Sequence, residues 1–433
     1  MRAFRSVGRS AALCILGRMR ILLVTWGSTG DVLPYAGLGA RLKAAGHDVT
    51  VATSERHAAR FRAGGMPVHI LPLARHEESA LSAERFDRWQ SPARLRRRKR
   101  NAQEMTQVIA RGVLEAVTDG ADIILAHPMT HPLCAVIAEG TGRACIGIYA
   151  ASPGMLVPRV GADTATGRGY RAAETLAWAA TYPLYAAALS WLRRELGLRG
   201  RRFRTPSGIL RGARVLHGFS SALLPKGLVL PQGHTCAGYW WPPTDSTWQP
   251  GSRLADFLAS GPAPVFFGFG SLSIGDAEQL SDMIRTVVRR LGVRAVVQAG
   301  WQGLDVHGDG ILTIGECPHD WLFPRMSALV HHAGSGTVGA GLRAGVPAVP
   351  VPLVLDQPFW ARRLVALGLS PGYVSARRLT ADSLSTTLRT ALQDERYRER
   401  CTEISRTVES DDGTIAVLDE LAGRADPRAP VVS

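Results

Sequence analysis

The chain has 433 residues and a formal net charge of +15, which comes from 51 lysines and arginines against 36 aspartates and glutamates. Apolar residues make up 46% and charged residues 20%, an ordinary composition for a globular chain, and the length predicts two or three domains of about 150 residues each. The positive charge calls for an anionic partner or surface. The sequence contains no helix-turn-helix, zinc-finger or aromatic RNA-binding motif, so a nucleic-acid partner is not expected.

The first 18 residues combine an arginine-bearing start with a short apolar run. The run is too short for a secretory signal and lacks a cleavage site, so we expect residues 1–18 to be a disordered extension or the product of a mis-assigned start. The cysteines are scattered, without a C-x-x-C pair or metal-ligand spacing, which predicts reduced core residues and a cytoplasmic setting. They are Cys14, Cys134, Cys145, Cys236, Cys317 and Cys401.

Short apolar runs alternate with helical stretches, which predicts doubly wound parallel sheets. In the first half these runs cover residues 21–25, 48–52, 68–72, 122–126, 144–149 and 215–219. A second series covers residues 265–268, 294–298, 311–314, 328–331 and 348–351. We therefore expect an α/β fold with two Rossmann-like domains facing across a cleft, at residues 19–224 and 251–424, with a Pro-, Gly- and Trp-rich linker at 225–250 and a tail at 425–433.

The first predicted strand ends in the turn WGSTGDVLP. Its two glycines present Asp31 at the mouth of the sheet, just before a helix that Pro34 can start. Asp31 is either an N-cap residue or a catalytic base, and the turn alone does not separate these interpretations. We interpret three nearby histidines as structural or exposed: His47, His57 and His69.

The positive charge is concentrated at residues 94–100 and 193–204. The uncharged stretch before the second run, residues 175–192, is at the lower limit for crossing a bilayer, but it is alanine-rich and broken by Pro183. This favours a pair of buried or interfacial helices. The basic runs are either solvated faces or a contact for anionic lipid headgroups. In the second case four aromatic side chains of the stretch rest on the membrane surface: Trp178, Tyr182, Tyr185 and Trp191.

The segment HHAGSGT at residues 331–337 follows an apolar strand and can open a helix. A helix start carries partial positive charge and free amide donors, so an anionic diphosphate is favoured there. His332 can donate to the same phosphates, and Asp356 with Gln357 can hold sugar hydroxyls. These are the parts of a nucleotide-sugar site.

The same residues also spell a dinucleotide fingerprint, G-x-G-x-x-G, with Asp356 22 positions after Gly334. Two observations favour the nucleotide sugar. The fingerprint normally opens the first βαβ unit of its domain, whereas several strand-like runs precede this one. Asp356 also begins a helix after the strand at 347–352 and does not end a strand. A glycine-rich structural turn is the third interpretation.

Five motifs occur together in this chain. They are GSTGDVLP at 27–34, GFGS at 268–271, PHDWLFPR at 318–325, HHAGSGT at 331–337 and DQPFW at 356–360. The combination resembles nucleotide-sugar-dependent glycosyltransferases with two Rossmann-like domains, the GT-B fold. The resemblance is strongest to sterol glucosyltransferases and to bacterial enzymes that glycosylate antibiotics such as macrolides, and it covers residues 19–424.

This resemblance implies a metal-independent, inverting transfer without a cofactor, in which Asp31 takes the proton of the acceptor hydroxyl. Many relatives have a histidine there, so in this chain a carboxylate must act directly. Plant relatives have an aromatic residue where Glu316 stands, which leaves the choice between UDP and dTDP sugars open. With residues 316–319 framing the nucleotide base, the implied donor-binding residues are Ser271, His319, His332, Gly334, Ser335, Gly336, Thr337, Asp356 and Gln357.

We therefore expect a cytoplasmic glycosyltransferase that moves a hexose, glucose first among them, from a UDP- or dTDP-sugar to a hydroxyl of a lipophilic acceptor. The acceptor is a sterol, a polyketide or another secondary metabolite, or alternatively a membrane lipid reached by peripheral contact with the inner membrane face. Two alternatives come from other classes. An epimerase of the same architecture needs further acid/base residues and no acceptor pocket, and a non-catalytic nucleotide-sugar binder needs no intact site.

Overall fold

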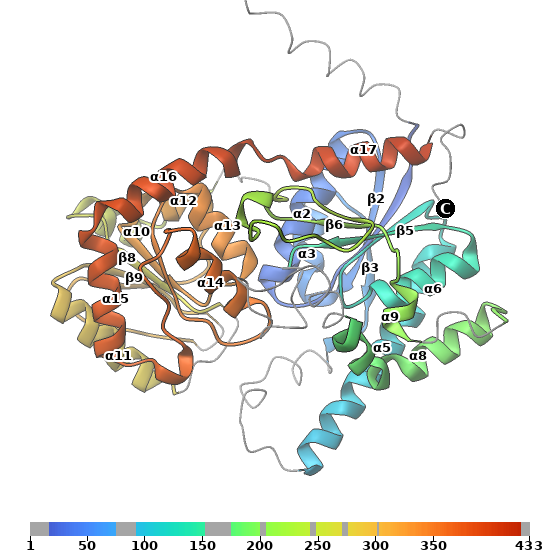
Figure 1. The fold of residues 1–433 in the computed structure, drawn as a ribbon, viewed down its shortest axis with the longest axis horizontal. Coiled ribbons are helices and arrows are strands. Elements are labelled where there is room, and N and C mark those ends of the chain that lie inside the picture. Colours follow the sequence, from blue (N-terminus) through green and yellow to red (C-terminus); the bar gives the residue numbers. More distant parts are fainter. Residues whose placement is uncertain are drawn as a thin grey trace, which may run out of the picture.

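The computed structural model describes residues 17–74, 92–151, 175–199, 205–242, 248–270, 276–300 and 303–425. Its strands form two parallel sheets that lie side by side (Figure 1). One sheet has seven strands in the order β3-β2-β1-β4-β5-β6-β7, and the other has five in the order β10-β9-β8-β11-β12. The predicted α/β fold with two doubly wound parallel sheets is confirmed.

The seven-stranded sheet comes from the first half of the chain. Its strands are β1 Arg20–Val24, β2 Asp48–Ser54, β3 Val68–Leu71, β4 Ile123–Ala126, β5 Ala144–Tyr149, β6 Val215–His217 and β7 His234–Cys236. The helices of this half are α2 Thr29–Ala44, α3 Glu55–Ala63, α5 Pro92–Thr118, α6 His131–Thr141, α8 Tyr182–Glu195, α9 Pro206–Ile209 and the 3-10 turn η3 Ser221–Leu223.

The five-stranded sheet comes from the second half. Its strands are β8 Val265–Gly268, β9 Ala295–Gln298, β10 Ile311–Ile314, β11 Ala328–His331 and β12 Ala348–Pro350. Its helices are α10 Ser252–Ala259, α11 Ala277–Leu291, α12 His319–Leu322, α13 Ser335–Arg343, α14 Gln357–Ala366, α15 Ala381–Gln393, α16 Glu395–Ser410 and α17 Gly413–Ala425, with 3-10 turns η4 Phe323–Arg325 and η5 Ala376–Arg378. All eleven predicted strands are present, six in the first sheet and five in the second.

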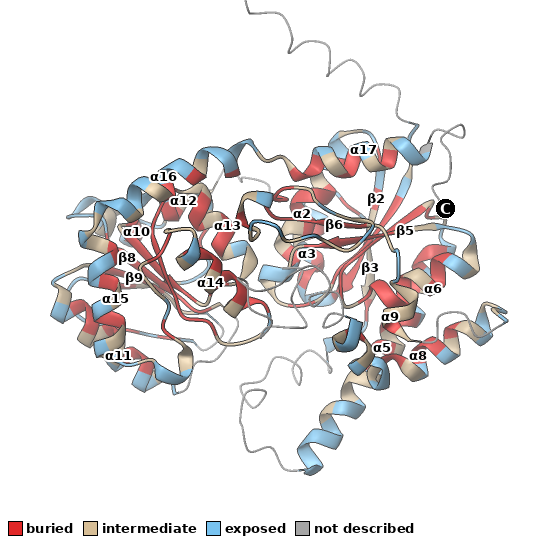
Figure 2. Cartoon of the chain, viewed as in Figure 1, coloured by how far each residue is buried: buried red, intermediate tan, exposed pale blue. Residues whose placement is uncertain are grey.

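Both sheets are covered by helices on both faces, which explains why their strands read as continuous apolar runs (Figure 2). In the first sheet, side chains of α2 and α17 pack on one face and those of α5, α6 and α8 on the other. In the second sheet, α11 and α15 cover one face and α13, α14 and α16 the other. The five described cysteines are free, and Cys134, Cys317 and Cys401 are buried, as predicted for reduced core residues.

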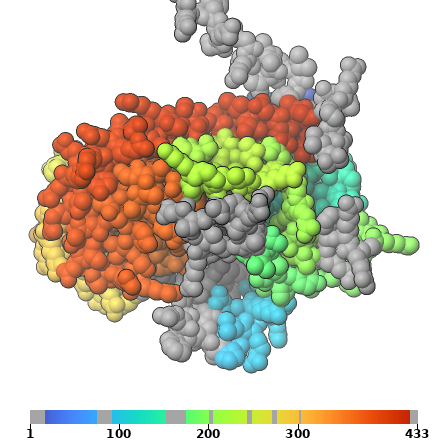
Figure 3. All heavy atoms as spheres, in the orientation of Figure 1, coloured from blue at the N-terminus to red at the C-terminus, as the bar shows by residue number. Residues whose placement is uncertain are grey.

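The last two helices cross from one half of the molecule to the other (Figures 1 and 3). Helix α16 packs against α13, whereas α17 returns to α2 and buries Val417 and Leu421 in the core beneath β1. An ion pair of 2.7 Å joins Arg214, just before β6, to Glu420. The carboxyl-terminal helix therefore stabilises the amino-terminal half.

Residues 238–242 cross between the halves where three glycines leave room for them. A Cβ atom added at Gly37 in α2 would overlap the carbonyl oxygen of Trp241, and one at Gly339 in α13 would overlap the ring of Tyr239. One at Gly413 would overlap the backbone of residue 238. The indole Nε1 of the buried Trp240 donates to the carbonyl of Gly413 at 3.1 Å. The crossing segment is therefore packed against α2, α13 and the start of α17.

The apolar stretch at 175–192 forms two helical pieces, residues 175–180 and α8, as its Pro183 predicts. The expected surface role of its aromatic residues is wrong for Trp178 and Tyr185, because both are buried. Trp191 is half-buried with the guanidinium of Arg111 over its ring at 5.4 Å. Tyr185 and Trp191 belong to the apolar face that α8 packs against α5 and α6. Within the described ranges, no helix combines the length and apolar character that a bilayer crossing requires.

Substituting Gly37→Ala is expected to destabilise the protein by about 1–3 kcal/mol, because the new methyl group overlaps a carbonyl oxygen in a packed interface. Urea unfolding measures this. Gly423→Ala in α17 is the matched control: a Cβ atom there meets nothing, and alanine is preferred over glycine in a helix by about 1 kcal/mol. Equal stabilities for the two variants would contradict the tight crossing.

Candidate functional site

The candidate site lies where the carboxyl ends of the two sheets meet. The turn after β1 leads into α2, the turn after β11 leads into α13, and these two helices contact each other. A Cβ atom added at Gly336 would lie 3.8 Å from the carbonyl oxygen of Gly30. The two turns that the sequence singled out, one in each half, are therefore brought together.

Asp31 is the third residue of α2, and Ser28 is its N-cap. The backbone N–H and the hydroxyl of Ser28 both donate to Oδ2 of Asp31, at 2.8 Å each. Ser28 is therefore the N-cap, and Asp31, at the N3 position of a capping box, reaches back to it. Gly27 has a φ of 131°, and a Cβ atom there would lie 2.6 Å from the same Oδ2. The glycine is needed for the carboxylate to take this position.

His127 lies beside this turn, and the sequence analysis missed it. It follows β4, and its backbone N–H donates to the carbonyl of Val24 at the end of β1. Its ring lies edge-on to the ring of Tyr35, with centroids 5.7 Å apart. Burial lowers the pKa of His127 to about 4, although the charge of Asp31 acts in the opposite direction. A polar residue directly after a buried strand was the signal that could have found it, because such residues collect at the carboxyl edge.

On the donor side, α13 begins at Ser335 with Gly334 as its extended N-cap. Nδ1 of the buried His331 accepts the N–H of Ala333 at 3.0 Å, which fixes the turn that leads into the helix. Ser335 and Thr337 are half-buried, and Gly336 is exposed. A helix start leaves its first amides without partners inside the helix, so the start of α13 can bind an anion beside the turn of Asp31.

The imidazole of His332 lies between two glycines. A Cβ atom at Gly270 would be 2.9 Å from its Cε1, and one at Gly334 would be 2.5 Å from its Nε2. Burial lowers the pKa of His332 to about 4, with the charge of Asp31 opposing it. The ring is therefore neutral at pH 7 and can donate one N–H. Ser271, the predicted donor residue beside it, lies outside the described residues.

His319 opens α12 and stacks on Phe323 with ring centroids 4.2 Å apart. Burial lowers its pKa to about 4, and the neighbouring His332 lowers it further. Glu316, three residues earlier, is exposed and forms a 2.7 Å ion pair with Arg60 of α3. The segment predicted to frame a nucleotide base is thus joined to the first half of the molecule.

Asp356 and Gln357 lie at the start of α14, as predicted, and both are buried. Oδ2 of Asp356 accepts the indole N–H of Trp360 at 2.8 Å. Oε1 of Gln357 accepts the backbone N–H groups of Leu353 and Val354, at 2.8 and 3.1 Å. The amide oxygen of Gln357 is therefore used to shape its own loop, and its NH₂ group is the part that can serve a ligand.

Two residues other than glycine have a positive φ in the described part of the chain: Ala333 at 63° and Leu355 at 54°. Each is adjacent to a predicted donor residue: Ala333 follows His332, and Leu355 precedes Asp356. Left-handed backbone of this kind costs about 1–3 kcal/mol and persists where the surrounding structure enforces it, often at ligand sites. Both donor-side loops are therefore held in an unfavourable conformation.

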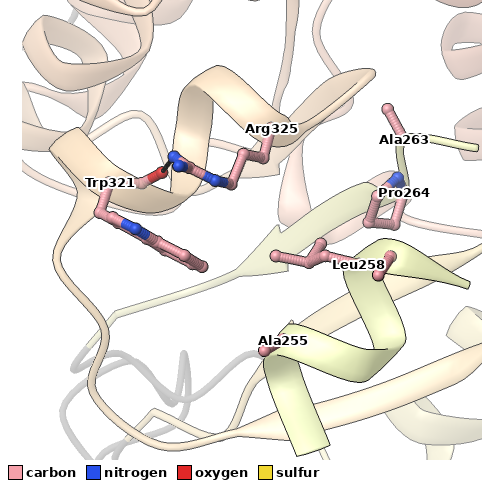
Figure 4. A pocket seen from close by; sticks show the side chains of 7 residues that line it. Ala255, Leu258, Ala263, Pro264, Trp321 and Arg325 are labelled. Carbon is pink, nitrogen blue, oxygen red and sulfur yellow. Dashed lines mark hydrogen bonds between the residues drawn. The ribbon is translucent and has the colours of Figure 1, made fainter. Parts of the chain in front are cut away.

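A separate apolar pocket lies away from this site (Figure 4). Its lining includes Ala255 and Leu258 of α10, Pro264 just before β8, and Trp321 with Arg325 stacked on its ring at 4.2 Å. Pro264 is at the amino end of its sheet, the edge opposite the candidate site. Among the described residues, no group of three or more His, Cys, Asp or Glu side chains could hold a metal ion.

The family described as Erythromycin biosynthesis protein CIII-like, C-terminal domain, matches residues 293–422. A sterol 3-beta-glucosyltransferase of Arabidopsis thaliana is 27% identical over 96% of this chain and 69% of its own length. The O-mycaminosyltylonolide 6-deoxyallosyltransferase of Streptomyces fradiae is 29% identical over 91% of this chain and 95% of its own. The chain is a glycosyltransferase of the GT-B fold.

The enzyme is related both to sterol glucosyltransferases and to Streptomyces antibiotic glycosyltransferases. It spans 26% of the sterol 3-beta-glucosyltransferase of Debaryomyces hansenii, so the fungal relative is much longer. Among solved structures, the calicheamicin glycosyltransferase superposes with a TM-score of 0.67 at 19% identity, over 95% of this chain and 100% of that one. The resemblance to glycosyltransferases of the GT-B fold is confirmed, and the epimerase and the non-catalytic binder are set aside.

Substituting His332→Ala is expected to weaken binding of UDP and dTDP by roughly 10-fold or more, since a hydrogen bond to a charged group contributes about 1.5–3 kcal/mol. Calorimetry measures both affinities. His307→Ala, which removes an exposed histidine of the same half, is the control. Unchanged affinity for both nucleotides in the His332 variant would exclude the diphosphate role.

Proposed function

We propose that the enzyme transfers a hexose, glucose first among the candidates, from a UDP- or dTDP-sugar to a hydroxyl of a lipophilic acceptor, with inversion and without a metal ion. The observation that carries this proposal is the contact between the turn of Asp31 and the start of α13. A base and an anion-binding helix start on opposite sides of one cleft are what a single displacement at an anomeric carbon requires.

The diphosphate of the donor lies against the amides of residues 335–337, where the helix dipole favours negative charge. His332 donates a hydrogen bond to a phosphate oxygen. These fixed donors stabilise the charge that grows on the nucleoside diphosphate as its bond to the sugar breaks, which is the task a metal ion performs in other enzymes.

Asp31 takes the proton of the acceptor hydroxyl as that oxygen attacks the anomeric carbon from the face opposite the leaving group. The two hydrogen bonds from Ser28 hold Oδ2, so the orientation of the carboxylate is set before the acceptor binds. Asp356 and the NH₂ group of Gln357 bind hydroxyls of the hexose, with Ser271, His319, Gly334, Ser335, Gly336 and Thr337 completing the donor site. Inversion follows from a single displacement.

The names of the relatives support the substrate classes. The plant and fungal relatives are sterol glucosyltransferases, and the Streptomyces relative acts on a mycaminosyltylonolide. Two of the similar solved structures are complexes with thymidine diphosphate. A sterol, a polyketide or another secondary metabolite is therefore the proposed acceptor, and both nucleotides stay in the proposal.

The test measures nucleotide release from UDP-glucose and dTDP-glucose, with and without a sterol or a macrolide aglycone. Release is expected only with an acceptor, together with a β-linked product from the α-linked donor. In the Asp31→Asn variant turnover should fall by roughly 100-fold or more while UDP and dTDP still bind, because the cap geometry is kept and the base is lost.

Asp119→Asn is the control for this experiment, since Asp119 is an exposed aspartate of the same half. Near-normal turnover in the Asp31 variant would remove that residue from the mechanism. Equal release of nucleotide with and without every acceptor would contradict transfer to a lipophilic alcohol.

The proposal includes peripheral contact of α5 with anionic membrane, where a lipophilic acceptor is available. The first turns of α5 carry six cations, and all except the half-buried Arg98 are exposed: Arg94, Arg96, Arg97, Arg98, Lys99 and Arg100. Leu95 on the same turns and Leu176 are also exposed, at 53% and 70%. The side chain of Gln103 donates to the carbonyl of Pro183 at 2.7 Å, so α5 and α8 adjoin here. Cations beside exposed apolar groups suit a headgroup interface.

Co-sedimentation with vesicles tests this contact. Binding is expected to anionic vesicles at low salt and to be lost at high salt. Exchanging Arg96, Lys99 and Arg100 for Gln should weaken it by roughly 100-fold, since each cation near an anionic leaflet contributes about 1 kcal/mol. The same exchange at Arg253, Arg389 and Arg406 is the control, because all three are exposed in the other half. Equal, negligible binding to anionic and neutral vesicles would leave α5 a solvated surface.

A further inference from the structure

A buried arginine joins α14 to the chain that leaves the first sheet. Arg363 is 6% exposed, its Nε donates to the carbonyl of Leu223 at 2.7 Å, and its Nη2 donates to the carbonyl of Leu224 at 3.1 Å. These carbonyls belong to η3 and the residue after it, six and seven residues beyond the end of β6. A buried guanidinium requires such partners, because an unpaired charge in the interior is very costly. The geometry of this junction is therefore strongly enforced.

Trp360 lies one turn before Arg363 and makes a second contact with the same chain. It is 1% exposed, and its ring packs edge-on against Phe219 with centroids 5.1 Å apart. Phe219 follows β6 by two residues and also contacts the ring of His217, the last residue of that strand. A continuous line of packed rings thus runs from the seven-stranded sheet into α14.

The indole of Trp360 also contacts the N-cap residue of the same helix. Its indole N–H donates to Oδ2 of Asp356 at 2.8 Å, four positions earlier in the chain. Asp356 is 9% exposed, and the residue before it, Leu355, has a φ of 54°. The direction of the Asp356 carboxylate therefore depends on where the Trp360 ring lies, and the Trp360 ring is held against Phe219.

We propose that Trp360 and Arg363 are positioning residues for Asp356, which fix the hexose-binding carboxylate relative to the sheet that carries Asp31. The inference rests on the proposed function, because it takes Asp356 as the group that binds the hexose. Since η3 continues from the seven-stranded sheet, its contacts with α14 set the distance between the donor sugar and the acceptor base. Neither Trp360 nor Arg363 touches a substrate in this proposal; both act through Asp356.

Substituting Trp360→Phe keeps a ring against Phe219 and removes the N–H that holds Asp356. The expected result is a fall of about 10-fold or more in kcat/KM for the nucleotide sugar, the scale of a lost hydrogen bond to a charged group, while the affinity for UDP and dTDP is unchanged. If Trp360 had only a structural role, the variant would bind the nucleotide and the nucleotide sugar more weakly by the same factor. Trp248→Phe is the control, because Trp248 packs on Trp321 in the same core and contacts no carboxylate of the site.

A second variant, Arg363→Lys, keeps the charge and loses the two-pronged contact with Leu223 and Leu224. It is expected to lower kcat/KM in the same way, again without a change in nucleotide affinity. Because both side chains act on one helix, the double variant should lose less than the product of the two single losses. If the loss of kcat/KM in the double variant equals the product of the two single losses, the two residues do not share this role.

Asp356→Asn separates this inference from the proposed function. The Asp356→Asn variant is compared with the wild type in kcat/KM and in how much more tightly it binds the nucleotide sugar than the nucleotide alone. If neither quantity changes, Asp356 does not bind the hexose, and the inference is wrong as well. If that variant loses this difference in affinity while Trp360→Phe keeps wild-type kcat/KM, only the positioning role is wrong. A Trp360→Phe variant that loses nucleotide affinity and kcat/KM equally would also overturn the positioning role.

Discussion

The crossing segment at residues 238–242 sets the geometry on which the site depends. It passes between α2, α13 and the start of α17 at positions where a Cβ atom on Gly37, Gly339 or Gly413 would overlap it. Close-packed contacts of this kind do not deform continuously, so they hold the two sheets in one mutual arrangement. Asp31 lies in the first turn of α2, and Gly336 lies in the first turn of α13. Because the crossing segment packs against both helices, it keeps these two helix starts close together. The glycine of the fingerprint at 339 is thus explained by packing on Tyr239 and not by a dinucleotide.

The strands could be predicted because parallel sheets covered on both faces leave a strong signal. β4 reads IILA with every residue buried, and such a run has few other interpretations. β7 could not be predicted as a strand of the first sheet, because its three residues are half-buried or exposed and carry no apolar run. The packing of α17 on the first sheet could not be predicted either. An apolar stripe such as that of Val417 and Leu421 indicates that a helix is buried, but it does not indicate which core the helix packs against.

At the site, the sequence predicted features that depend on neighbouring residues, such as the starts of helices. Helix α14 starts at Asp356 as predicted, and α13 starts inside the segment HHAGSGT, at Ser335. The predicted start of α2 at Pro34 is wrong, because Ser28 caps the helix and α2 begins at Thr29. Contacts between residues far apart in the chain, such as the ion pair of Arg60 with Glu316, could not be predicted from the sequence. The roles of the predicted donor residues stay predictions. The structure adds that the buried carboxylate of Asp356 is held by Trp360, a contact that the spacing of the motif does not predict.

The electrostatics of the cleft follow from burial more than from charge. Burial lowers the pKa of His127, His319 and His332 to about 4 and that of His331 to about 3, so all four rings are neutral at pH 7. On the proposed function, the amides at the start of α13 and an N–H of His332 donate to the diphosphate oxygens. Fixed dipoles of this kind need no reorganisation when charge develops on the leaving group.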